Sequence, residues 1–166
     1  MKNSNYIKLF LIILATVLGV IIICNLYRNY DGNKNNKSYL SKYVSSINYN
    51  ELANTTTELS STSFVYLSYI GNKNVYDNEK KLRKVIKQYD LEDNFIYVDC
   101  TDKLTAKNTV KGLDNIFDVG NKEIVVPAII FYKDNEPVDY IDSSEGLLNV
   151  SSFSWLLDKH EIKEKE

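Results

Sequence analysis

Residues 124–135 read IVVPAIIFYKDN, an apolar run with a proline near its start and a turn at its end. The run is rich in β-branched and aromatic residues and is bounded by turn formers, so it predicts a buried strand. Because Pro127 has no N–H to donate to a sheet, it belongs at the start of that strand. Asp134 and Asn135 predict a hairpin turn into a second strand over residues 137–141.

Upstream of this hairpin the apolar pattern predicts alternating strands and helices. Strands are expected over residues 43–47, 64–70 and 95–98. Helices are expected from Asn48 or Asn50 to Leu59, over 75–89, over 105–119, and after a cap at Ser151 or Ser152. The order β-α-β-α-β-α-β-β-α predicts a partly parallel sheet to which the hairpin adds an antiparallel pair.

The N-terminal segment is almost wholly apolar over residues 9–26, long enough as a helix to cover a bilayer core. Tyr27 and Tyr30 follow it, at positions typical of interfacial aromatic residues. We expect an uncleaved transmembrane signal anchor over residues 9–27. A cleaved signal peptide is disfavoured because no Ala-x-Ala follows, and a lipoprotein signal because Ile23 precedes Cys24.

The composition divides the chain into five expected segments. These are a short tail (1–8), the anchor (9–27), a flexible Asn-, Lys-, Ser- and Gly-rich tether (28–42), a folded domain (43–160) and a charged tail (161–166). Positive charges nearly balance across the anchor, but the very short N-terminal tail favours the N-terminus inside. We therefore expect a single-pass protein of the cell membrane whose domain lies outside the cytoplasm, with membrane lipid as a partner of the N-terminal helix.

Several kinds of chemistry have no support in the sequence. A net charge of −2 gives no electrostatic footprint for nucleic acid. Cys24 and Cys100 form no spaced pair, so neither a metal site nor a CxxC motif is expected. The single histidine, His160, excludes most catalytic triads and is expected to be a solvated residue at a helix end. We expect no catalytic residue, no metal and no cofactor.

Several of these features together resemble the thioredoxin superfamily. They are Val126-Pro127 before an apolar strand ending in Lys133-Asp134-Asn135, the run 64–70 leading into Gly71 and a helix, and the strand that ends at Val98-Asp99. Within it, residues 43–160 look most like the small thioredoxin-like proteins of low-GC Gram-positive bacteria that include bacteriocin transport accessory proteins. The resemblance implies an α/β thioredoxin-like fold, a mixed central sheet flanked by helices, preceded here by one transmembrane helix. It also implies a cis Val126–Pro127 bond.

The resemblance also implies that the cysteine pair of redox-active members is missing from this chain. Redox-active members carry a CxxC at the start of the helix after the first core strand, where the helix dipole lowers the pKa of the first thiol. Val75 and Asn78 have that spacing and approximate position here, so the dithiol pair is absent. The superfamily docks extended peptides between this helix start and the residue before the proline. We expect Val75, Asn78, Val126 and Pro127 to form such a groove, unless Pro127 serves the fold alone.

The expected function is a membrane-anchored, redox-inactive module that binds an unidentified protein or peptide, for example as an accessory to secretion. The alternative is an oxidoreductase that uses the single thiol of Cys100. Asp99 and Asp102 argue against it, because nearby carboxylates raise the pKa of a thiol. A role in assembling a membrane complex stays open.

One helix face carries a dense set of charges. In the helix expected over 75–89 this face consists of Glu79, Lys80, Lys81, Arg83, Lys84 and Lys87. We expect the face to be solvated. The alternative is that its lysines touch anionic lipid headgroups if the domain lies near the membrane.

Overall fold

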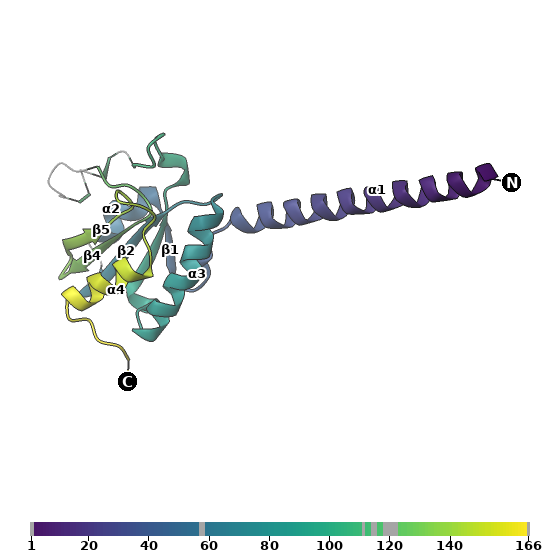
Figure 1. Cartoon of the computed structure of the whole chain (residues 1–166). Coiled ribbons are helices and arrows are strands. Elements are labelled where there is room, and N and C mark those ends of the chain that lie inside the picture. The colour runs from purple at the N-terminus through teal and green to yellow at the C-terminus, as the bar shows by residue number, and fades with distance from the viewer. Residues whose placement is uncertain (1, 57–58, 111, 114–115, 118–122, 166) are drawn as a thin grey trace. The chain divides into compact units, whose positions relative to one another are not determined.

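The structure is a computed structural model, and it describes residues 2–56, 59–110, 112–113, 116–117 and 123–165. The chain divides into two compact units, Met1–Lys37 and Ser38–Glu166, called unit 1 and unit 2 below. Unit 1 is built on the long helix α1, and unit 2 contains a sheet with flanking helices (Figure 1).

Unit 1 consists mainly of α1 (Lys2–Asn35), a helix of 34 residues. Its window Phe10–Tyr27 has a mean hydropathy of 2.6, and none of it is buried. Large apolar side chains such as Ile13, Val17 and Ile21 are half exposed or more. Among the described residues, α1 is the one helix long and apolar enough to cross a membrane. A helix that is apolar all round suits lipid better than water.

Unit 2 is organised around a five-stranded sheet in the order β1-β3-β2-β4-β5. The strands are β1 (Ser45–Asn48), β2 (Thr62–Ser68), β3 (Phe95–Asp99), β4 (Ala128–Lys133) and β5 (Glu136–Ile141). β3 pairs in parallel with both β1 and β2, and β4 pairs antiparallel with both β2 and β5. This is the mixed sheet that the sequence predicted, and the late hairpin supplies one of its antiparallel pairs.

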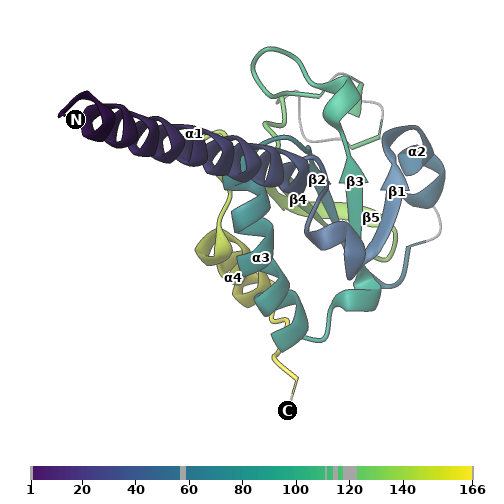
Figure 2. The same ribbon diagram turned by 90° about the vertical axis from the view of Figure 1, so that its right-hand side faces the viewer.

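Helices flank both faces of the sheet (Figure 2). α3 (Lys73–Gln88) and α4 (Val150–Lys159) pack on one face, and the short α2 (Leu52–Thr55) packs on the other. Short 3₁₀ turns lie between the larger elements: η1 (Leu40–Lys42), η2 (Tyr49–Glu51), η4 (Glu92–Asn94) and η5 (Thr101–Lys103).

The central strand β2 contributes to a core on each face. Because side chains alternate along a strand, Phe64 and Tyr66 join the core beneath α3 and α4, and Val65 and Leu67 join the opposite core. Every residue from Ser63 to Ser68 is buried. A strand buried on both faces needs the nearly continuous apolar run that the sequence shows here.

The β4–β5 hairpin has the geometry that its sequence predicted. Asp134 and Asn135 have φ values of 51° and 67°, which a two-residue type I′ turn requires and which Asn and Asp tolerate best among non-glycine residues. Pro127 directly precedes β4, and the Val126–Pro127 bond is cis. The proline therefore lies at one end of the sheet, where β4 begins.

The helix expected over residues 105–119 is wrong for the described part of that segment, which contains no α-helix. The segment instead forms two antiparallel bridges, Leu104 with Val110 and Thr109 with Val125. The N–H of Thr109 donates to the Thr105 hydroxyl at 3.2 Å, and such bonds between a side chain and the backbone compete with helix formation. Three apolar residues of the pattern, Val110, Leu113 and Phe117, are still buried, and Ile116 is partly buried. Val119, the expected end of the helix, lies outside the described residues.

The segment expected as a flexible tether, residues 28–42, is mostly part of regular structure. α1 continues to Asn35 and unit 2 begins at Ser38, so Asn36 and Lys37 alone join them. The folded domain therefore starts at Ser38 rather than Tyr43. The flexible composition was misleading because a buried side chain of α3, described below, fixes the first residues of unit 2.

The C-terminal segment also belongs to the fold. Ile162 packs against the core beneath α3 and α4. The N–H of Lys165 donates to the carbonyl of Gln88, and its ammonium group donates to Asp90 at 2.7 Å. The expected charged tail over residues 161–166 is thus attached to the end of α3 over its described part.

Candidate functional site

The first feature of the site is the start of α3, which follows β2 after a short turn. Gly71 has a φ of +88°, a conformation that glycine adopts without strain. The side chain of Asn72 then caps the helix by accepting the N–H groups of Asn74 at 2.9 Å and Val75 at 3.3 Å. Val75 and Asn78 follow in the first turns of α3, three residues apart and therefore on one side of it.

The second feature is the start of β4, which lies beside the end of β2. Leu67 of β2 pairs with Ala128 of β4, so the sheet brings Pro127 to the end from which the chain continues into α3. A chain of hydrogen bonds links the two segments through the loop before α4. The Asn78 amide donates to the Leu148 carbonyl, the Leu148 N–H donates to Ser143 Oγ at 3.1 Å, and the Ser143 hydroxyl donates to the Pro127 carbonyl at 2.7 Å.

All four residues of the predicted groove are buried. Val75 and Val126 are 1% exposed, Asn78 is 6% exposed, and Pro127 is buried as well. The Asn78 amide already has its partner in Leu148. The structure therefore gathers these residues at one end of the sheet, but their side chains offer little surface to a peptide. Their part in binding stays a prediction.

The backbone before the proline also has partners within unit 2. The N–H of Val126 donates to the Asn108 carbonyl at 2.9 Å. The N–H of Val125 donates to the Asp142 carboxylate at 3.2 Å, and the Val125 carbonyl accepts the N–H of Ser143 at 3.0 Å. A peptide that adds to Val126 through its N–H would have to replace Asn108.

An open surface lies beside these buried residues. A hollow of about 650 Å³ is lined by Tyr140, Ile141, Asp142, Ser144, Glu145, Gly146, Leu147, Leu148, Asn149, Ser152 and Trp155. Leu147 is 41% exposed and Trp155 is 54% exposed, so the hollow presents two large apolar side chains to solvent. Both charged residues of the lining are acids. Sequence reasoning missed this surface because the loop after β5 carries no pattern of its own.

Cys100 is close to the site in the sheet but has no access to solvent. Its N–H donates to the Ser68 carbonyl at the end of β2, while its side chain is fully buried in the core that lies opposite α3 and α4. Burial, and to a smaller extent the charge of Asp99, raises the pKa of the thiol to about 12. A thiol that is buried and protonated at neutral pH is a poor nucleophile.

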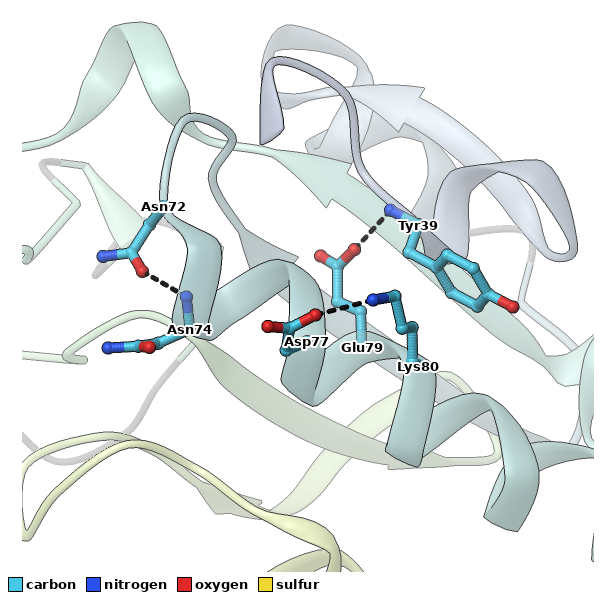
Figure 3. A network of polar contacts seen from close by, with 6 residues as sticks. All are labelled: Tyr39, Asn72, Asn74, Asp77, Glu79 and Lys80. Carbon is cyan, nitrogen blue, oxygen red and sulfur yellow. Dashed lines mark hydrogen bonds and ion pairs between the residues drawn. The ribbon is translucent and has the colours of Figure 1, made fainter. Parts of the chain in front are cut away.

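Glu79 corrects the expectation for the outer face of α3, because it is 1% exposed. Its carboxylate accepts hydrogen bonds from the Ser38 hydroxyl (2.8 Å), the N–H of Tyr39 (2.6 Å), the N–H of Leu40 (3.2 Å) and the Ser68 hydroxyl (3.1 Å). Figure 3 shows Glu79 directed toward the Tyr39 backbone, with Lys80 next to it on the helix. Burial raises the pKa of this carboxyl group, and the four hydrogen bonds act in the opposite direction.

A signal for Glu79 was present in the sequence. It lies four residues after Val75 and three before Leu82, which places it on the apolar side of the helix. A carboxylate on that side needs polar partners. The partners come from Ser38–Leu40 and Ser68, and the sequence does not show that these segments meet α3.

The remaining candidate residues do not join the site. His160 Nε2 lies 2.9 Å from Asp139 Oδ2, and its ring packs 4.4 Å from that of Phe131. It is therefore a half-buried structural residue rather than the solvated one that we expected. The part of the chain that the structure describes contains no group of three or more His, Cys, Asp or Glu residues arranged to hold a metal ion.

The comparisons with known proteins concern the fold. No protein-family model and no curated protein matches the chain. Among solved structures it is similar to thioredoxin f2 of Chlamydomonas reinhardtii, with 10% identity, a TM-score of 0.49, and coverage of 72% of this chain and 98% of that one. It is also similar to the oxidised thioredoxin of Plasmodium falciparum, with 16% identity, a TM-score of 0.48, and coverage of 70% and 97%.

A third similar structure is a chloroplastic thioredoxin z, with 15% identity, a TM-score of 0.47, and coverage of 72% and 96%. The strand order, the helices on both faces and the proline before β4 make the fold of unit 2 thioredoxin-like. Such a fold supports many functions, so the function has to be argued from the site.

Proposed function

We propose that this chain is a membrane-anchored, redox-inactive thioredoxin-like module that binds a protein or peptide outside the cytoplasm. α1 is the anchor in this proposal, and unit 2 is the binding module. The resemblance of the sequence to bacteriocin transport accessory proteins favours a role as an accessory to secretion. The extracytoplasmic side of unit 2 is part of the proposal.

The observation that carries the proposal is the placement of Asn78. It has the spacing of a resolving thiol, yet its amide group is hydrogen-bonded to Leu148 in the chain that leads to Pro127. An amide cannot exchange a disulfide, and Val75 supplies no nucleophile. In this proposal an apolar and an amide side chain occupy the positions where a dithiol pair would be needed.

The alternative function, an oxidoreductase that depends on Cys100, has less support. Its thiol is fully buried, and the pKa raised to about 12 leaves almost no thiolate at neutral pH. Dithiol chemistry also needs a second cysteine, and Cys24 belongs to unit 1.

The surface that we assign to the partner is the hollow beside the buried corner. It is open and partly apolar, and its volume is within the usual range of ligand sites. Because Asp142 and Glu145 are the charged residues of its lining, a peptide with Lys or Arg beside an apolar residue fits it best. Exposed Leu147 and Trp155 supply the apolar contacts.

The experiment is a selection from a displayed random-peptide library on the immobilised full chain in detergent. We expect enrichment of peptides that combine Lys or Arg with an apolar residue. The Leu147→Asp substitution puts a charge into the apolar part of the hollow and should weaken binding of the selected peptides by about tenfold or more.

Val138→Asp is the matched control, since Val138 is 51% exposed on β5 but does not line the hollow. Peptide binding should survive this change. Fluorescence of Trp155, the single tryptophan of the chain, reports whether each variant is folded. Equal losses in the two variants, or no enrichment on the wild type, would remove the hollow from the proposal.

A further inference from the structure

The outer face of α3 is strongly basic. Lys80, Lys84 and Lys87 lie at i, i+4 and i+7 and form one stripe, and Lys81 flanks it. These four residues are called the α3 lysine face below. Lys80 is paired with Asp77 at 2.6 Å. Among the residues that the structure describes, none of the three exposed lysines, Lys81, Lys84 and Lys87, forms an ion pair.

The chain joins unit 2 right beside this face. The first residues of the unit, Ser38, Tyr39 and Leu40, are bonded to the Glu79 carboxylate, and Glu79 directly precedes Lys80 on α3 (Figure 3). Because Glu79 is buried and accepts all of these donors, this attachment is fixed within unit 2.

The distance from the apolar window to this attachment is short. The window ends at Tyr27, α1 is helical to Asn35, and Asn36 and Lys37 lead to Ser38. Eight helical residues rise about 12 Å, and the joint adds at most roughly 10 Å. Whatever direction unit 2 takes, Ser38 therefore stays within about 22 Å of the end of the window, a span that lets unit 2 reach the headgroup layer of a bilayer.

Tyrosines surround the same attachment. Tyr39 packs against Tyr43 and Tyr76, with ring centroids 5.3 and 5.7 Å away. Arg83 lies over the ring of Tyr43 at 3.8 Å, and Tyr43 is 40% exposed. Tyrosine beside Lys and Arg is the composition typical of protein surfaces at a membrane–water interface.

We infer that the α3 lysine face binds the anionic headgroups of the membrane in which α1 is inserted. This inference rests on the proposed anchoring by α1. Basic residues close to an anionic surface are attracted within about one Debye length, roughly 10 Å at moderate salt. Contact on this side would hold α3 at the membrane and restrict the directions in which the peptide-binding hollow can point.

Lipid fits this face better than other anionic partners. The net charge of the chain is −2, which disfavours nucleic acid. An acidic protein would use the same charges, but it would not account for the short joint or for the tyrosines. Lys81 labelling that does not change with the charge of the lipid would contradict the inference and favour such a protein instead.

The test uses the full chain in vesicles of phosphatidylcholine alone or of phosphatidylcholine mixed with phosphatidylglycerol. An uncharged acylating reagent labels lysines, and mass spectrometry follows Lys81 and the exposed reference Lys103. We expect Lys81 to be labelled roughly threefold or more slowly in the anionic vesicles, with Lys103 unchanged. About 1 M salt should abolish the difference, because the Debye length falls to about 3 Å.

Two double variants with the same change in net charge test whether the α3 lysine face, rather than the overall charge of the chain, protects Lys81. Lys84→Glu with Lys87→Glu should abolish the protection of Lys81. Lys107→Glu with Lys133→Glu, at exposed positions on other elements, should keep it. Loss of protection in both variants, or none in the wild type, would overturn the inference.

Failure of the anchor gives a different result. A chain that alkaline washing removes from neutral vesicles lacks the proposed anchor, and Lys81 protection on anionic vesicles would then show that the face acts without it. A chain that resists washing but shows equal Lys81 labelling in both lipids keeps the anchor and refutes the lysine face.

Discussion

At the scale of single residues, Glu79 connects two parts of unit 2 that are far apart in sequence. Its carboxylate holds Ser38, Tyr39 and Leu40 on one side and Ser68 on the other. A buried carboxylate is tolerated when hydrogen bonds replace its hydration. The start of the domain and the end of β2 therefore depend on one side chain of α3.

The pKa of Glu79 leads to a prediction for the pH dependence of stability. Burial raises this pKa above its ordinary value of 4.5, so the folded state binds the proton more tightly than the unfolded state. The stabilising effect of protonation is fully present below pH 4.5 and is lost as pH rises through the raised pKa. Glu79→Gln is neutral at every pH. We therefore expect the free energy of unfolding of the wild type, relative to Glu79→Gln, to fall as pH rises from about 4.

Urea unfolding at several pH values, followed by Trp155 fluorescence in detergent, measures this difference. Glu145→Gln also removes one carboxyl group, but from an exposed position, and is the matched control. A relative stability that increases with pH would contradict the account, because it would mean that the four hydrogen bonds outweigh burial.

The residues at the corner differ in how far the sequence could predict them. Val75, Asn78 and Pro127 could be placed at one end of the sheet, because Gly71, the helix start and the proline before β4 are local signals. Their burial could not be predicted, since it depends on Leu148 and Ser143 in a loop without periodicity. The attachment of Glu79 to Ser38 was missed because residues 28–42 have the composition of a linker.

At the scale of elements, the two helices that share one face of the sheet, α3 and α4, both begin with asparagine caps. Asn72 caps α3, and Asn149 caps α4 by accepting the N–H groups of Ser151 and Ser152. The sequence predicted Ser151 or Ser152 as the cap of α4. The structure places these serines inside the helix, because Asn149 has the extended backbone that a cap requires.

The cap of α3 can be tested directly. Asn72→Ala removes the acceptor for the N–H groups of Asn74 and Val75 and should lower the free energy of unfolding by about 1 kcal/mol. Asn74→Ala changes an exposed residue of the same turn and should stay within about 0.5 kcal/mol of the wild type. Urea unfolding of both variants checks this, and equal effects would argue against the cap.

The segment between β3 and β4 shows the limit of periodicity. Its apolar residues are buried as predicted, but as bridged, irregular chain rather than as a helix. Thr105 and Thr109 bond to each other, and Gly112 has a φ of +84°. Local polar bonds and the left-handed residues Asn108 and Gly112 thus outweigh an apolar spacing that also suits a helix.

At the scale of the whole molecule, the chain combines an apolar helix with a small α/β domain through a joint of two residues. The sequence predicted both parts and their order, because an apolar segment and an alternating pattern are strong signals. The prediction made the joint too long. The part of α1 that follows the apolar window is polar and has the composition of a flexible linker.

The proposed anchor can be tested with charges in α1. Leu14→Arg together with Leu18→Arg places two cations in the middle of the apolar window, at a cost of about 3 kcal/mol each. We expect this variant in the soluble fraction after alkaline extraction of membranes from expressing cells. Leu14→Ala with Leu18→Ala, which keeps the window uncharged, should stay in the membrane. Wild-type chain that is extracted as easily as the arginine variant would rule out the anchor.

The proposed function requires that a thioredoxin-like fold works here without thiol chemistry, and the decisive assay is reduction of insulin by the full chain in a Cys24→Ser background. We expect a rate no higher than that of the variant that also carries Cys100→Ser. A neutral disulfide reagent should react with Cys100 only after unfolding, because the side chain is fully buried and burial raises its pKa to about 12. Catalytic turnover that disappears on Cys100→Ser would contradict the proposed function.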